Sequence, residues 1–553
     1  MSTRARGTAV LASAALLVLA APALAAQAAT SWVPTATQGE PTGGLTDAGA
    51  APAAMPLQVS VALRLRNASA LTGAIAADQT LTPSQFGATY APTATAASAV
   101  ASYLTSQGFT GVHTSDNNVL VTATGTVARA QSAFHTAIES FTLNGQKVFA
   151  NVTGAEVPAA LGSTVSAVLG LNDVGVMTPL HKKTTPTTTS APASCLASGV
   201  GYPCTYNPQG FWSAYDATSA PTGANTSIAI FAEGDLTQVI NDLRTEESAN
   251  GLPQVPVSVV PTGPASTDTS GADEWDMDTQ YSTGMAQSVQ NLYVYDATSL
   301  TDADIAREFT TFATQDVATA GSASFGECEF QAYLDGSMTA DDEALAQAAV
   351  QGQSVFASAG DTGGFCPVAP NNGVPAGVPD VDYPASSPYV VGVGGTTLVT
   401  NSDGSYDQET AWVAGGGGPS LFEAAPSWQS GVVPPISTAC AVQALTVCGR
   451  AVPDVAMDAD PNSGANVYVD GTPEGVGGTS LSSPLTLGVW ARLQSGHGNA
   501  LGFASPRLYQ AAGGAGYHDI VLGDTGPYPA TPGYDLATGI GTFDVAQMES
   551  AIG

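Results

Sequence analysis

Ser480 lies in a stretch that reads Gly-Gly-Thr-Ser-Leu-Ser-Ser-Pro and leads into an apolar run. The two glycines allow a sharp turn, and the run that follows is typical of a helix. A serine at such a helix start is a candidate nucleophile, because the free N–H groups there also hold an oxyanion. A serine hydroxyl is a weak nucleophile, however, and needs a base, which is most often histidine.

The histidines do not supply this base in the usual place. After residue 190 the chain has only His497 and His518, and both follow Ser480. A subtilisin-like enzyme would carry a His-Gly-Thr-His type of segment before its serine, and this chain has none. Chain order alone excludes neither histidine, because catalytic triads occur in several orders. A subtilisin-type hydrolase that uses His518 therefore stays open as an alternative.

Residues 271–287, GADEWDMDTQYSTGMAQ, offer a different base. If 273–285 is helical, Glu274 and Asp278 are four residues apart and share a face, whereas Asp276 points elsewhere. Glu274 also lies near the helix start, where the helix dipole favours its ionised form. Glu274 can thus accept the Ser480 proton in acid while Asp278 orients it. The alternative interpretation is a solvated acidic helix face.

Asp361 follows the apolar run SVFASAG, at the strand end where α/β folds build their sites. A protonated Asp361 would donate a hydrogen bond to an oxyanion; otherwise it simply opens a turn before two glycines. Asp-Thr-Gly occurs at both Asp361 and Asp524, and paired Asp-Thr-Gly loops mark pepsin-like aspartic peptidases. Those enzymes are all-β, whereas alternating strands and helices precede Asp361.

Together these residues resemble the sedolisins, or serine-carboxyl peptidases, which include kumamolisins and tripeptidyl peptidases. The motifs that carry the resemblance are EWDMD, SAGD, ETAWVAGGGGPSLFEAAPSWQ, RAVPDVAMDADP and GGTSLSSP, in the family's order. The resemblance runs from about residue 55 to the C-terminus. It implies Glu274 as general base, Asp278 as its partner, Ser480 as nucleophile and Asp361 in the oxyanion hole. It also implies a subtilisin-like catalytic fold and a ferredoxin-like propeptide that acts as an intramolecular inhibitor or chaperone.

The tail YHDIVLGDTGPYPATPGYDLATGIGTFD, residues 517–544, resembles the family's calcium site. Calcium takes 6–8 oxygen ligands from carboxylates, carbonyls and water. The resemblance implies Ca²⁺ held by the Asp519 and Asp535 carboxylates and by the carbonyls of Ile520, Thr531 and Gly533. The family usually has glycine where Thr531 stands. An ordinary turn-rich loop is the alternative.

Composition shifts divide the chain into five parts. Residues 1–28 have two arginines, an apolar core and small-residue cleavage sites, which predict a secretory signal peptide. Residues 29–54 are rich in Ala, Pro, Thr and Gly, and we expect them to be disordered. Residues 55–178 alternate strands and helices as an α+β activation propeptide does, and 179–194 form an exposed Thr/Pro linker with the processing site, cut near Ser194. In 195–553, the peptidase domain, short apolar strands alternate with helices and predict an α/β parallel sheet with flanking helices.

The net charge of −33 argues against nucleic acid or a membrane surface as partner. After the signal peptide no stretch is long and apolar enough to span a membrane. Only 11 % of residues are charged, so the surface loses few ion pairs when carboxylates are protonated. This favours an acidic working environment, although ordinary solubility explains it as well.

All six cysteines follow residue 190, and an even number in an exported chain predicts disulfides. We expect pairing between sequence neighbours, 195–204, 328–366 and 440–448. The sequence thus predicts a secreted, extracellular, monomeric peptidase that cleaves proteins or peptides in acid, more as an endopeptidase than as a tripeptidyl peptidase. A non-catalytic binding protein on the same fold is the remaining alternative.

Overall fold

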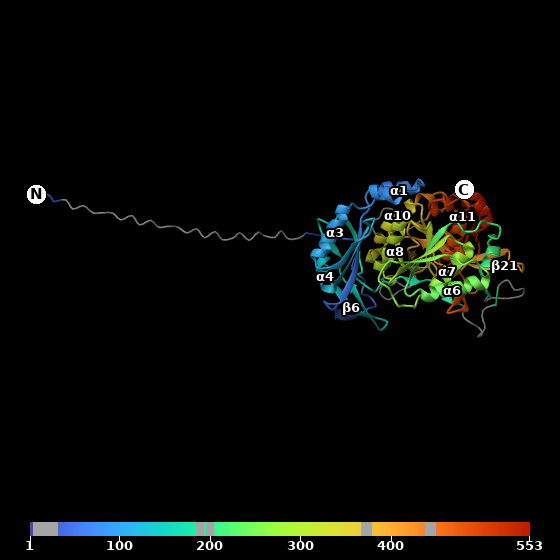
Figure 1. Ribbon diagram of the computed structural model, residues 1–553, viewed down its shortest axis with the longest axis horizontal. Helices are drawn as coiled ribbons and strands as arrows, with labels where there is room; N and C mark the ends of the chain where they lie inside the picture. The colour runs from blue at the N-terminus through green and yellow to red at the C-terminus, as the bar shows by residue number, and fades with distance from the viewer. Residues whose placement is uncertain (4–30, 184–192, 195–203, 367–378, 437–448) are drawn as a thin grey trace. The chain divides into compact units, whose positions relative to one another are not determined.

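A parallel sheet lies at the centre of the C-terminal part of the computed structural model, which describes residues 1–3, 31–183, 193–194, 204–366, 379–436 and 449–553 (Figure 1). The strand order is β15-β16-β14-β17-β19-β21-β22, and β25 pairs with the inner part of β21. Only β22 runs antiparallel to its neighbour among these strands. Their bounds are Ser227–Glu233 (β14), Val257–Pro261 (β15), Asn291–Ala297 (β16), Ala320–Ala323 (β17), Ser354–Ser358 (β19), Val391–Thr400 (β21), Tyr406–Ala411 (β22) and Val455–Asp458 (β25).

Helices cover both faces of this sheet (Figure 1). On one face α7 (Ala272–Ala286) packs against α6 (Thr237–Asn250) and α11 (Thr479–Gly496). On the other face α8 (Asp302–Gln315) packs against α10 (Ser337–Val350). The central strands are buried on both sides, which is why they read as continuous apolar runs. The predicted parallel sheet with flanking helices is confirmed.

The N-terminal part has its own four-stranded antiparallel sheet, in the order β4-β5-β3-β9. These strands are Pro56–Leu63 (β3), Thr110–Thr114 (β4), Leu120–Thr126 (β5) and Val165–Leu169 (β9). Helices α3 (Ala94–Ser106) and α4 (Val127–Ala133) cover one face, as expected for an α+β propeptide. A hairpin of β6 (Ile138–Leu143) and β7 (Gln146–Asn151) turns at Asn144-Gly145, and both residues have the positive φ that such a turn requires.

The other face of this sheet packs on α8 and α10. Small apolar side chains meet there: Ala62, Leu120, Ala167 and Leu169 from the N-terminal sheet, and Ala303, Ala306 and Ala340 from the two helices. The Ser60 hydroxyl also donates to the Ala303 carbonyl at 3.0 Å. The N-terminal domain therefore covers helices of the catalytic domain rather than standing apart from it.

The expectation of disorder for residues 29–54 is wrong for most of that segment. Trp32–Pro34 (β1) pairs with Glu156–Pro158 (β8), and Thr46–Ala50 (β2) pairs with β6. Between them Glu40 is buried, where it accepts hydrogen bonds from Gln331. The segment has no apolar core of its own, but edge strands supply its backbone hydrogen bonds.

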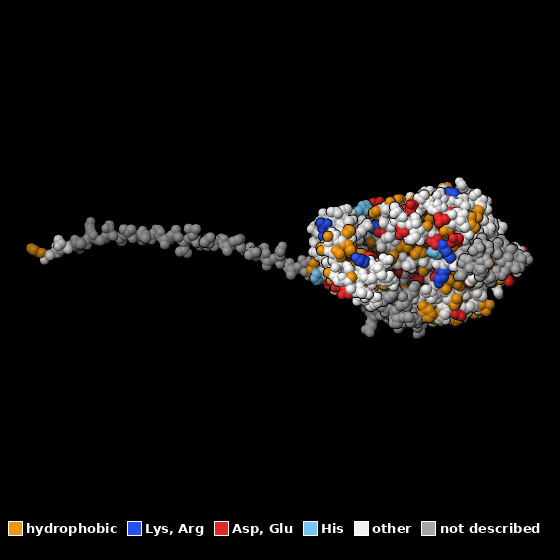
Figure 2. Space-filling view, turned by 90° about the horizontal axis from the view of Figure 1, so that it is seen from below, with side chains coloured by type: hydrophobic (Ala, Val, Ile, Leu, Met, Phe, Trp, Pro, Cys, Tyr) orange, Lys and Arg blue, Asp and Glu red, His pale blue; other side chains and the backbone are white. Residues whose placement is uncertain are grey.

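Two further expectations lie partly outside the described residues. Most of the predicted signal peptide falls in residues 4–30, which are not described; no helix of the described chain has the length and apolar character needed to cross a membrane. The disulfide between Cys328 and Cys366 is present as predicted, whereas Cys195, Cys440 and Cys448 are not among the described residues. Figure 2 shows a face made mostly of uncharged side chains, in line with the low charged fraction.

Candidate active site

Helix α7 holds the predicted carboxylate pair in the interior. Glu274 lies in its first turn and Asp278 one turn later, and both are fully buried. Asp276, on another side of the helix, is also buried because α6 lies there. Burial, followed by the charge of Asp242, raises the pKa of Asp276 to about 8. The solvated acidic helix face is therefore wrong.

Ser480 is the second residue of α11, and the helix begins directly after Gly478, whose φ is +113°. The first N–H groups of this helix have no helical partner. The Thr479 N–H donates to Asp361 Oδ1 at 2.8 Å, and the Ser480 N–H donates to the Leu180 carbonyl at 3.1 Å. Asp361 follows the C-terminal end of β19, so its hydrogen bond with Thr479 joins the end of β19 to the start of α11. Glu274, in the first turn of α7, is also close to Ser480. The starts of both helices and the end of β19 therefore meet at one point.

An extended segment, residues 178–183, runs through this point. Thr178–Pro179 (β10) pairs antiparallel with β18 (Phe325–Cys328), and Lys182–Lys183 (β11) pairs antiparallel with β27 (Thr472–Gly477). Between the two short strands, the Leu180 N–H lies 3.1 Å from Ser480 Oγ and 3.2 Å from the Ser324 carbonyl. Strand addition on both flanks is a common way to bind an extended peptide. This part of the predicted linker is therefore paired as strand beside Ser480 rather than looped out, although the side chains of Lys182 and Lys183 are exposed.

His181 contacts the predicted base. Its Nδ1 lies 2.6 Å from Glu274 Oε2, and its Nε2 lies 3.3 Å from Asp273 Oδ2. Burial opposes the imidazolium charge, but Glu274 and Asp273 outweigh it and raise the pKa of His181 to about 10. A protonated imidazole cannot accept the Ser480 proton, so His181 does not act as the base. Sequence reasoning missed this residue, although His-Lys-Lys is an unusual run in so acidic a chain.

The pKa values of the two buried carboxyls depend on each other and on the charge of His181. Burial raises the pKa of Glu274, and the His181 charge opposes that rise. Burial and then the charge of Glu274 raise the pKa of Asp278 well above its ordinary value. The Ser324 hydroxyl donates to Asp278 Oδ1 at 2.6 Å. Ser480 is close enough to lower the pKa of Glu274, while its hydroxyl donates to the Ser324 carbonyl and accepts the Leu180 N–H, each at 3.1 Å.

Asp361 is positioned to face the Leu180 carbonyl. Its Oδ1 accepts hydrogen bonds from the Thr479 N–H and hydroxyl at 2.8 and 2.9 Å. Its Oδ2 is buried and has no partner among the described residues. A β-carbon placed on Gly478 would collide with both Asp361 Oδ2 and the Leu180 oxygen, so these two oxygens flank the same small space. Burial, opposed by the Thr479 hydrogen bonds, raises the pKa of Asp361 to about 7. The neutral side chain can thus donate from Oδ2 into this space.

The other candidate bases lie elsewhere. His518 stacks on Tyr406 with ring centroids 3.8 Å apart. His497 follows the last turn of the 18-residue helix α11, about 25 Å from Ser480 at 1.5 Å per residue. Asp524 is exposed, and its Oδ1 accepts the Gly526 N–H within its own turn. Neither the histidine alternative nor the pepsin-like one agrees with this arrangement.

Four of the five predicted calcium ligands are in contact in pairs in the C-terminal loop. Asp519 accepts the Gly533 N–H at 2.9 Å, and Asp535 accepts the Thr531 N–H at 2.8 Å. The fifth residue, Ile520, is next to Asp519 and buried. Two carboxylates and three backbone carbonyls would offer calcium only oxygen donors, which is the chemistry it prefers. The donor types are therefore compatible with this ion.

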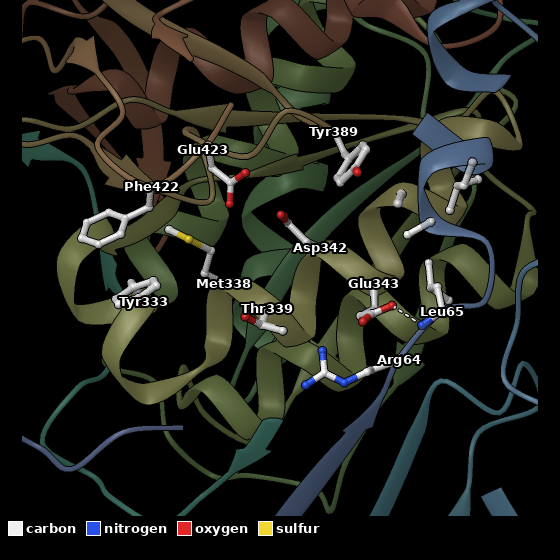
Figure 3. Close-up of a pocket in the computed structure, with 13 residues that line it drawn as sticks. Arg64, Leu65, Tyr333, Met338, Thr339, Asp342, Glu343, Tyr389, Phe422 and Glu423 are labelled. Atoms are coloured by element: carbon white, nitrogen blue, oxygen red, sulfur yellow. Dashed lines mark hydrogen bonds between the residues drawn. The ribbon is translucent and has the colours of Figure 1, made fainter. Parts of the chain in front are cut away.

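A separate cavity of about 480 Å³ lies between the two domains (Figure 3). Arg64 and Leu65 line it from the N-terminal domain, and Asp342, Glu343 and Glu423 line it from the catalytic domain. Glu343 accepts the Leu65 N–H at 2.7 Å, shown as the dashed line in Figure 3. None of the four predicted catalytic residues lines this cavity, so it belongs to the contact between the domains.

Comparison with known proteins agrees with this geometry. Residues 43–174 match the pro-kumamolisin activation domain, and residues 264–512 match the subtilase family. The chain is 35 % identical to sedolisin of Pseudomonas sp. (strain 101), over 96 % of this chain and 93 % of that protein. It is 31 % identical to kumamolisin of Bacillus sp. (strain MN-32), over 76 % of each chain. It is also 36 % identical to xanthomonalisin of Xanthomonas sp. (strain T-22), but spans only 65 % of that protein's length.

A solved structure extends the likeness to three dimensions. Pseudomonas sedolisin, a serine-carboxyl proteinase complexed with two molecules of pseudo-iodotyrostatin, superposes with a TM-score of 0.57 at 37 % identity. The match covers 65 % of this chain and 98 % of that one. The chain therefore belongs to the sedolisin family of serine-type peptidases, with an N-terminal pro-kumamolisin activation domain.

Proposed function

We propose that this protein is a secreted endopeptidase that acts in acid and is made as a self-processing zymogen. Ser480 is the nucleophile, Glu274 the general base, Asp278 the partner that orients the base, and Asp361 an oxyanion donor. The observation that carries this proposal is the Leu180–His181 peptide unit, which lies against Ser480 and Glu274 as a substrate would. Strands on both sides of that unit hold it extended.

The proposed reaction passes through an acyl-enzyme. Ser480 Oγ attacks the carbonyl carbon while its proton passes to Glu274, and the oxygen of that carbonyl takes up the charge. The Ser480 N–H and the protonated Asp361 stabilise this oxyanion. Glu274 then gives the proton to the leaving amine, and water hydrolyses the ester by the reverse sequence.

Two features support processing within the chain. In the zymogen His181 occupies Glu274 at 2.6 Å, which keeps the base from accepting the Ser480 proton. Transient protonation of Glu274 in acid would end that ion pair and allow the segment to move; Glu274 must then lose this proton before it acts as the base. The position of Leu180 against Ser480 favours a first cut between Leu180 and His181, before the processing site near Ser194 that the sequence suggests.

The unprimed side of the cleft, N-terminal to the cleaved bond, favours endopeptidase action. A tripeptidyl peptidase must close its cleft after the third residue before the bond, which here is Thr178. The bound chain instead continues to Met177, which is buried and whose N–H donates to the Leu300 carbonyl at 3.1 Å. A cleft that takes a fourth residue and a continuing chain suits internal bonds.

Calcium and export complete the proposal. Ca²⁺ held by Asp519, Asp535 and the carbonyls of Ile520, Thr531 and Gly533 would stabilise the C-terminal loop without entering the reaction. The N-terminal sequence and the Cys328–Cys366 disulfide support an extracellular location. We expect the mature enzyme to act as a monomer on proteins or peptides.

The decisive experiment is digestion of a mixed peptide library by the acid-treated zymogen, with product masses as the readout. Internal cuts that the zymogen makes and the Ser480→Ala protein does not make support the proposal. Release of tripeptides alone would show a tripeptidyl peptidase. Equal inactivity of both proteins at every pH would favour a non-catalytic binding protein.

A further inference from the structure

The primed side of the cleft, C-terminal to the cleaved bond, holds three consecutive basic residues of the chain itself. His181, Lys182 and Lys183 follow the bond that faces Ser480. These include two of the three lysines in the whole chain, which has 13 Lys and Arg against 46 Asp and Glu. Because basic residues are so rare in this chain, three in succession next to Ser480 are a specific feature of the site.

Two of these three cations form ion pairs with carboxylates of the catalytic domain. In an extended strand alternate side chains point to the same side, so His181 and Lys183 face one wall together. His181 Nε2 lies 3.3 Å from Asp273 Oδ2, and Lys183 Nζ lies 3.2 Å from the same oxygen. Lys183 also lies 2.9 Å from Glu474 Oε2. Lys182 points to the other side, where its ammonium lies 5.5 Å from the ring centroid of Trp412.

The catalytic domain has no described cation of its own for these two carboxylates. Arg244, Arg307 and Arg450 are paired with Glu247, Asp304 and Asp454 respectively. Arg492 donates to backbone carbonyls, and Arg507 pairs with Asp78 of the propeptide. When the linker leaves, Asp273 and Glu474 therefore face the cleft without a counter-charge from the described residues.

We propose that Asp273, supported by Glu474, is a specificity-determining residue that selects substrates with a basic residue directly after the cleaved bond. This inference rests on the proposed peptidase function and names the substrate class of the same cleft. Asp273 is the stronger determinant because its side chain is 22 % exposed and its partner His181 is 18 % exposed. The side chains of Lys183 and Glu474 are 45 % and 39 % exposed, so solvent screens the attraction between them. The third residue after the cleaved bond should therefore contribute less to substrate selection than the first.

The test uses mature enzyme and three quenched fluorescent peptides that differ only in the residue after the cleaved bond: Lys, Ala or Glu. We expect kcat/KM for the Lys peptide to exceed that for the Ala peptide about tenfold, the effect of one partly buried ion pair. Asp273→Asn should bring the Lys-to-Ala ratio close to one, whereas Glu474→Gln should leave it nearly unchanged, because the Glu474 carboxylate contacts the third residue after the bond. Asp407→Asn, which removes an exposed charge from β22, should keep the wild-type ratio.

The ratio is taken within each protein, so a general loss of activity in a variant cancels. A wild-type ratio near one, or an Asp273→Asn ratio equal to that of the wild type, would overturn the proposal while leaving the peptidase function intact. Failure of the wild type to cut any of the three peptides, together with failure to process its own linker, would instead refute the proposed function.

Discussion

Asp361→Asn separates the proposed oxyanion role of Asp361 from a merely structural role. The Thr479 N–H and hydroxyl both donate to Oδ1, so an asparagine must place its own oxygen there and its amide nitrogen at the position of Oδ2. That nitrogen is a donor at every pH. The variant therefore keeps the donor that a protonated Asp361 supplies and removes only its titration.

The magnitude follows from the pKa of about 7 that burial gives to Asp361. A group with this pKa is about 99 % protonated at pH 5 and about 9 % at pH 8, so loss of the donor alone lowers the rate about tenfold between them. The nearby Lys182 lowers this pKa, so departure of the linker from the mature enzyme shifts the decline to slightly higher pH. Asp361→Ala should lose about 10²–10³ in kcat at pH 5, the usual effect of one oxyanion donor.

The assay is kcat/KM for one peptide from pH 3 to 9 with wild-type, Asp361→Asn and Asp361→Ala enzymes. Immobilised wild-type enzyme cuts each zymogen first and is then removed, so that slow self-processing does not bias the comparison. The asparagine variant should keep most activity in acid and lack the decline near pH 7. If it declines with the wild-type midpoint, or if the alanine variant keeps more than a tenth of the activity, Asp361 is not the donor.

Four further outcomes are expected. The Ser480→Ala zymogen should stay full length in acid, and mass spectrometry of the wild type should show the first cut after Leu180; maturation of the variant at the normal rate would contradict self-processing. Chelator should lower the melting temperature of the mature enzyme and Asp535→Ala should reproduce that loss, whereas equal melting curves would remove calcium from the proposal. His518→Ala should keep catalysis, and a wild-type rate that rises through pH 6–7 would instead indicate a histidine base. Burial, and then the charge of Asp335, raise the pKa of Glu40 to about 8. The stability that protonated Glu40 contributes to the zymogen is therefore present in acid and is lost as the pH rises through 8. Between pH 6 and 9 the melting temperature of the Glu40→Gln zymogen should therefore fall less than that of the wild type.

Local patterns predicted those parts of the site whose geometry is set within one element. The helical period alone places Glu274 and Asp278 on one face of α7, and the glycines before Ser480 allow the turn that starts α11. The apolar runs of the central strands indicated a parallel sheet because both faces of such a sheet are covered. Asp361 was predicted at the end of a strand, where it lies.

The rest depended on contacts between distant segments. Leu180 meets Ser480 across 300 residues, and its position is set by the edges of β18 and β27 rather than by its own composition. Composition therefore suggested an exposed linker, although its first residues lie in the cleft. In the same way the pairing of β1 and β2 with strands more than 85 residues later is invisible in a segment rich in Ala, Thr and Gly.

The interior, as well as the proposed catalytic residues, contains carboxyl groups that favour the folded state in acid. Asp341 is fully buried, with no hydrogen-bond partner for either oxygen among the described residues, and burial raises its pKa well above the ordinary value. Asp276 behaves in the same way, with a pKa of about 8. Groups of this kind bind a proton in the folded state that they release in the unfolded state at neutral pH, so each one lowers stability as the pH rises above about 4. Protonation removes this penalty in acid, where Asp361 also holds the proton that we propose it donates to the oxyanion. Burial thus raises the pKa of these interior carboxyls and of the proposed oxyanion donor by the same physical cause.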